Sequence, residues 1–99
     1  MDKETITKII NEVKKKESKV SENWNQRYKD NMDKIKTGEF DNVAEVYKIL
    51  TLRERQKGLS GAEKKMLSNI KQIASSEISF SSNIEKPEAE ELLVEMLFS

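Results

Sequence analysis

The apolar residues of this chain recur at helical spacing almost from end to end, and this periodicity limits the fold more than any other feature. The first stripe, at positions i, i+3, i+4 and i+7, consists of Ile6, Ile9, Ile10 and Val13. No segment of useful length alternates apolar and polar residues with the period of two that is typical of a half-buried strand. The pattern therefore predicts an all-α protein without a β-sheet.

Five helices are predicted in one compact domain that spans residues 1–99, since a chain of this length can close a single core. The expected segments are about 3–16, about 23–37, about 41–56, from about 61 onward, and a last helix whose first turn holds Pro87. The serine-rich stretch 75–83 is interpreted as the fraying end of the fourth helix and a loop. We expect a helical bundle with short connections.

The third and fourth segments carry the strongest packing signals. Residues 41–56 are apolar on most of the helix circumference, which predicts a helix surrounded by the others. The fourth segment opens with Ser60 and Glu63, the spacing of a capping box, which fixes where Lys64 and Lys65 point. Its predicted buried stripe consists of Ala62, Met66, Leu67, Ile70, Ile73, Ala74 and Ile78.

Composition excludes several classes of function. The chain has no Cys and no His, which excludes disulfides, thiolate chemistry, zinc sites of the usual kind and imidazole catalysis. Carboxylate pairs such as Glu90 with Glu91, or Asp30 with Asp33, stand at ordinary helix-surface positions. No apolar run is long enough to cross a bilayer. We therefore expect no enzyme, no cofactor, no metal, no small-molecule substrate and no membrane contact.

Trp24 is the only tryptophan, and it begins a segment, residues 23–29, that combines a large flat ring with cationic and amide groups. Such a ring can stack on bases or wedge between them, while Arg27 and Lys29 neutralise phosphates. The alternative is that Trp24 is a half-buried packing anchor. Charge is also uneven along the chain, because residues 48–71 are mainly cationic and residues from 77 onward mainly acidic.

Three ordered stretches carry a resemblance to a known family. They are residues 23–40, which begin NWNQRYKDNMDKIKTG, residues 43–46, and residues 57–67, which read KGLSGAEKKML. Together they resemble the C-terminal domain of the CarD family, also called CdnL, whose members are bacterial regulators that bind RNA polymerase. The similarity covers about residues 3–97.

The resemblance implies a helical DNA-binding domain that works at promoters in the bacterial cytoplasm, associated with the nucleoid through RNA polymerase. In the family, an N-terminal Tudor-like domain binds the polymerase β subunit, and a tryptophan of the helical domain enters the minor groove at the upstream edge of the transcription bubble. This stabilises the open complex. Trp24 matches that wedge, and Met32, with Tyr28 on the same stripe, matches apolar support for it. The positions that match contacts to the phosphate backbone are Arg27, Lys29, Lys64 and Lys65.

Two departures from the family pattern matter. The chain contains no Tudor-like domain, so polymerase binding is not assigned to any residue here. Gln26 stands where members often have a second arginine, so one phosphate contact is expected to be lost or to become a neutral hydrogen bond. The alternative function is a helical protein-interaction module without DNA binding, in which the amphipathic first helix or the acidic last helix docks a partner.

Overall fold

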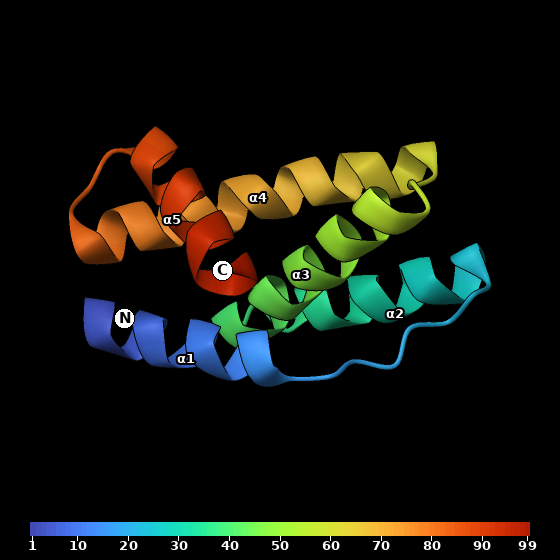
Figure 1. Cartoon of the computed structure of the whole chain (residues 1–99), viewed down its shortest axis with the longest axis horizontal. Coiled ribbons are helices and arrows are strands. Elements are labelled where there is room, and N and C mark those ends of the chain that lie inside the picture. Colours follow the sequence, from blue (N-terminus) through green and yellow to red (C-terminus); the bar gives the residue numbers. More distant parts are fainter.

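The computed structural model describes residues 1–99 as five α-helices without a strand. In chain order they are α1 (Lys3–Lys15), α2 (Trp24–Lys36), α3 (Phe40–Gln56), α4 (Gly61–Ser82) and α5 (Lys86–Phe98) (Figure 1). The longest connection is the extended segment between α1 and α2, which runs from near the middle of the molecule to the end where α2 begins (Figure 1). The predicted all-α fold with five helices is confirmed.

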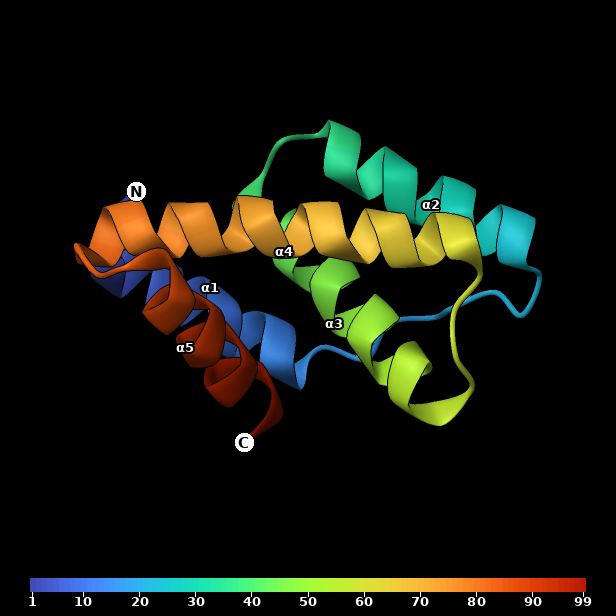
Figure 2. The same cartoon turned by 90° about the horizontal axis from the view of Figure 1, so that it is seen from above.

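Helix α3 lies at the centre of the bundle. Helices α1, α2 and α4 all pack against it, as the two views in Figures 1 and 2 show. Its buried apolar side chains cover most of its circumference, as predicted, and are Phe40, Val43, Ala44, Val46, Tyr47, Ile49 and Leu50. Because full burial of one such side chain contributes roughly 1.5–3 kcal/mol, α3 supplies the largest part of the hydrophobic stabilisation.

Helix α5 closes the core from the other side by packing against α1 and α4 (Figure 2). It buries Ala89, Leu93 and Leu97, one residue per turn. On the facing helix, α1 buries Ile6, Ile10 and Val13 from the predicted stripe, whereas Ile9 is only partly buried. The apolar faces of the first and last helices therefore cover each other.

Helix α4 continues further than the sequence suggested. The stretch 75–83 is not a fraying end and a loop, because the helix runs to Ser82. Ile78 is fully buried in the core, and this apolar burial outweighs the mediocre helix propensity of the serines around it. The helix ends at Asn83, which adopts the left-handed conformation with φ of 54° and donates its N–H to the carbonyl of Ser79. Asn83 is thus the residue at which α4 ends, and the serine-rich composition before it led to the earlier predicted end.

The buried stripe of α4 is also narrower than predicted. It consists of Met66, Ile70, Ala74 and Ile78, at steps of four residues. Ala62 and Ile73, which were expected in the stripe, are exposed, and Leu67 is partly buried. The difference arises because α2 packs mainly on α3, so the side of α4 that faces α2 is incompletely covered.

A buried carboxylate attaches α2 and the α1–α2 connection to α3. Glu45 is 3% exposed and accepts hydrogen bonds from Lys16 at 2.7 Å, Lys34 at 2.6 Å and Ser18 at 2.9 Å. Burial alone would raise the pKa of Glu45, but the hydrogen bonds from the two lysines and the serine outweigh burial and lower the pKa to about 2. Glu45 is therefore ionised throughout the physiological range.

Candidate nucleic-acid interface

Trp24 is the first residue of α2, and its indole is 48% exposed. Its backbone is fixed by the preceding residue, because the side-chain oxygen of Asn23 accepts the N–H groups of Asn25 at 3.0 Å and Gln26 at 3.2 Å. One turn further on, Tyr28 is partly buried and packs against the core. The structure therefore leaves the ring at the helix start half in solvent, an exposure that is compatible with a wedge and with the alternative of a half-buried packing anchor.

Arg27 occupies a different environment from the one expected of a phosphate contact. It is 4% exposed, and its guanidinium binds the carboxylate of Glu63 through two bonds, Nε to Oε2 at 2.6 Å and Nη2 to Oε1 at 2.8 Å. Nη1 donates to the carbonyls of Ser21 and Glu22, both at 3.2 Å. The hydrogen bonds between them raise the pKa of Arg27 and lower that of Glu63. Because its donors are engaged internally, we remove Arg27 from the expected phosphate contacts.

Lys64 and Lys65 follow directly on a capping box at the start of α4, as predicted. The Ser60 hydroxyl accepts the N–H of Glu63 at 3.3 Å, and Glu63 Oε1 accepts the N–H and the hydroxyl of Ser60 at 3.3 and 3.0 Å. Both lysines are exposed and form no ion pair. The starts of α2 and α4 lie at the same end of the molecule, so these lysines and Trp24 share that end (Figures 1 and 2).

The other cations of residues 48–71 are engaged within the molecule. Lys48 donates to backbone carbonyls at the end of α1, Arg55 lies 4.6 Å from the centre of the Phe98 ring, and Lys71 pairs with Glu90 at 3.8 Å. The remaining two, Arg53 and Lys57, face Glu22 at 3.7 and 3.2 Å. A hydrogen bond from Lys57 lowers the pKa of Glu22. Only Lys64 and Lys65 of this cationic stretch are left without a partner.

An apolar groove separates α2 from α4 beside this end of the molecule. Its lining from α2 is Tyr28, Met32 and Ile35, and its lining from α4 is Ala62, Lys65, Met66, Asn69, Ile70 and Ile73. The two predicted supporting residues, Tyr28 and Met32, thus share one wall, and Lys65 stands on the opposite wall. Lys29 is exposed and has no ion pair, but it lies about 140° around the helix from Trp24, at roughly 100° per residue.

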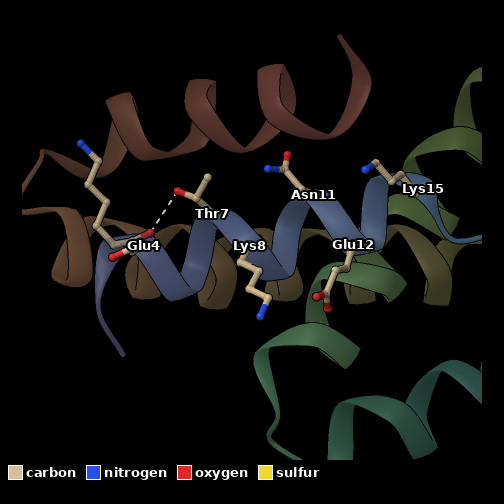
Figure 3. Close-up of a pocket in the computed structure, with 7 residues that line it drawn as sticks. Glu4, Thr7, Lys8, Asn11, Glu12 and Lys15 are labelled. Atoms are coloured by element: carbon tan, nitrogen blue, oxygen red, sulfur yellow. Dashed lines mark hydrogen bonds between the residues drawn. The ribbon is translucent and has the colours of Figure 1, made fainter.

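A second hollow, along α1, is lined by no hydrophobic residue and has no convergent polar groups. It is bordered by Lys3, Glu4, Thr7, Lys8, Asn11, Glu12 and Lys15. Figure 3 shows Thr7 and Asn11 on one side of the helix and Lys8 and Glu12 on the other, so these side chains do not converge on one point. The structure contains no group of three or more acidic side chains suited to holding a metal ion. None of its helices is both long and apolar enough to cross a membrane.

The sequence of this chain is similar to those of known proteins. Residues 8–94 match the family described as CarD, C-terminal domain. This chain belongs to the CarD family. A protein of Bacillus subtilis (strain 168) named "Putative transcription factor YdeB" is 49% identical over 55 residues, which are 56% of this chain and 36% of that protein. The match thus covers little more than a third of the length of the relative.

All the predicted site residues lie within the CarD match, but the structure separates the five predicted DNA contacts into two groups. Trp24, Lys29, Lys64 and Lys65 are exposed, whereas Arg27 is buried. Sequence reasoning identified Glu63 only as a capping residue and missed its role as the partner of Arg27. No signal in the sequence indicated this pairing, because Asp30 stands closer, three residues after Arg27 on the same helix, and spacing does not identify a partner 36 residues away.

Proposed function

We propose that this CarD-family domain contacts promoter DNA at the upstream edge of the transcription bubble, with Trp24 as a minor-groove wedge, and thereby stabilises the open complex. The observation that carries the proposal is the half-exposed indole at the start of α2, at the same end of the molecule as the unpartnered Lys64 and Lys65. A ring in this position can enter a base step while the lysines contact the backbone on either side.

The wedge alone is a weak ligand for intact duplex. Complete burial of a Trp removes roughly 150–250 Å² from water, worth at most about 4–6 kcal/mol. Because the free indole is 48% exposed, insertion gains only about half of this, roughly 2–3 kcal/mol. Unstacking a base step costs a few kcal/mol, so we expect Trp24 to bind best where the duplex is already opening.

Lysine contacts supply the salt-dependent part of the affinity. With Arg27 excluded, the candidate phosphate contacts are Lys29, Lys64 and Lys65. Three contacts to duplex DNA correspond to a slope of about −3 in log affinity against log salt concentration. The domain alone should therefore bind weakly at physiological salt and read shape more than base sequence.

Tethering to RNA polymerase would compensate for this weak affinity. We assign polymerase β-subunit binding to a separate Tudor-like domain, outside the residues of this chain, as the family resemblance implies. Such a tether raises the effective concentration of Trp24 at the bubble without a new DNA contact. The proposal places the protein in the bacterial cytoplasm, on promoters occupied by polymerase.

Fluorescence anisotropy of labelled DNA tests the proposal. The chain is titrated against a duplex and against a forked duplex of the same sequence at two salt concentrations. We expect tighter binding to the fork, and loss of this preference in Trp24→Ala. The matched control is Phe80→Ala, which removes an aromatic ring that is 84% exposed on α4. Absence of binding to either DNA at low salt would refute the proposal.

A protein-interaction module is the second candidate function. Ile73 and Phe80 are 51% and 84% exposed and lie seven residues, or about two turns, apart on the same face of α4, so this face presents two exposed apolar side chains. If the chain fails to bind DNA, this face of α4 is the surface to test for a protein partner.

A further inference from the structure

Helices α2 and α4 are linked by one polar contact. The hydrogen bonds between their side chains are those of Arg27 with Glu63, at 2.6 and 2.8 Å. The rest of α2 packs mainly on α3, and an open apolar groove separates α2 from much of α4. The angle between the first turns of the two helices therefore depends strongly on this ion pair.

Arg27 also fixes the backbone of the residues directly before Trp24. Besides binding Glu63, Arg27 donates to the carbonyls of Ser21 and Glu22, which lie just upstream of the helix start. Trp24 stands between these clamped carbonyls and Arg27 itself. Because about half of Trp24 is exposed, the position of its backbone contributes strongly to the direction of the indole.

Glu63, the other member of the ion pair, fixes the first turn of α4, which carries Lys64 and Lys65. Glu63 Oε1 accepts from Ser60 at the cap of α4 as well as from Arg27, and Glu63 is fully buried. Lys64 and Lys65 are the next two residues. A single carboxylate thus connects the turn that presents the indole to the turn that presents the unpartnered cations.

We infer that Arg27 and Glu63 are positioning residues, which fix the direction of Trp24 relative to Lys64 and Lys65 without touching DNA. This inference rests on the proposed DNA contact of Trp24. A wedge and phosphate contacts act together only when both meet one duplex at the correct spacing, since the backbone contacts set the register in which the ring enters.

Glu63→Gln tests the inference because a purely electrostatic effect of Glu63 and a positioning role of Glu63 predict opposite changes in DNA affinity. Gln at this position can still accept from Ser60, so the capping box is retained. Loss of a negative charge near DNA would by itself strengthen binding. If Glu63 positions the wedge, Glu63→Gln instead weakens binding to the forked duplex. We expect Trp24→Ala to cost about tenfold in affinity in the parent chain and clearly less in the Glu63→Gln background.

Arg27→Lys keeps the charge but removes the two-pronged contact with Glu63. A phosphate-binding residue would tolerate this change, whereas a positioning residue would not. We expect Arg27→Lys to reduce the preference for the fork and to leave the salt slope unchanged. Glu45→Gln is the matched control, because it also removes a buried carboxylate but leaves the first turns of α2 and α4 untouched. All titrations are made where circular dichroism shows each variant to be folded.

The outcomes separate the two proposals. If the parent chain binds neither DNA, the proposed function fails. If the parent chain prefers the fork, but Glu63→Gln and Arg27→Lys bind it as tightly as the parent, the positioning role is overturned while the function stands. If Glu63→Gln does not fold, Arg27→Lys and its combination with Trp24→Ala give the same comparison.

Discussion

Replacing Glu45 with Gln removes the charge to which Lys16 and Lys34 bind. The folded-state pKa of about 2, against an ordinary value of 4.5, corresponds to about 3 kcal/mol of stability at neutral pH. The side chain of Glu45 is only 4% exposed, so solvent screening reduces this figure little. Lys16 and Lys34 are 55% and 31% exposed and can turn toward water, so the variant leaves no buried cation behind.

The pH dependence of the stability difference between Glu45→Gln and the parent shows whether the ionised carboxylate of Glu45 causes it. Because the pKa of Glu45 is lower in the folded state, its contribution is complete above pH 4.5 and is lost as the pH falls through about 2. Thermal unfolding followed by circular dichroism should show Glu45→Gln melting roughly 12–24 °C below the parent at neutral pH, with the two converging under acid. Glu54→Gln, an exposed carboxylate on the same helix, is the control. A difference between Glu45→Gln and the parent that stays constant with pH would refute the reasoning.

Three further expectations concern single positions. Trp24→Ala should lower the free energy of unfolding by about 1 kcal/mol, well below the roughly 2–5 kcal/mol of an aliphatic core truncation, as urea unfolding can measure. Lys64→Gln and Lys65→Gln should each reduce the salt slope of DNA binding by about one, and an unchanged slope would remove that lysine from the interface. Asn83→Ala should cost about 1 kcal/mol because alanine resists the left-handed conformation, whereas Asn83→Gly should be nearly neutral in the same unfolding experiment.

Local signals predicted the helices and their starts well. The capping box at Ser60 and the position of Pro87 depend only on residues close in sequence, and both appear in the structure. The exposure of Trp24 was also readable, since a helix start projects its first side chain past the bundle. The end of α4 could not be predicted from the sequence, because the burial of Ser75 depends on helix packing rather than on local propensity.

The polar contacts that organise the molecule could not be derived in this way. Glu45 receives Lys16 from 29 positions away, and Glu63 receives Arg27 from 36 positions away. Each charged side chain in such a sequence has many possible partners of opposite charge. Only the packed backbone determines which partner lies within reach. Arg27 was therefore expected at a phosphate, although the fold places it against a carboxylate.

The mutual cover of α1 and α5 also determines when this fold can form during translation. Ile6, Ile10 and Val13 are synthesised before the other helices of this domain, yet part of the apolar surface that shields them, Leu93 and Leu97, is synthesised only with α5. We therefore expect the nascent chain to stay incompletely packed, and accessible to chaperones, until α5 has left the ribosomal exit tunnel.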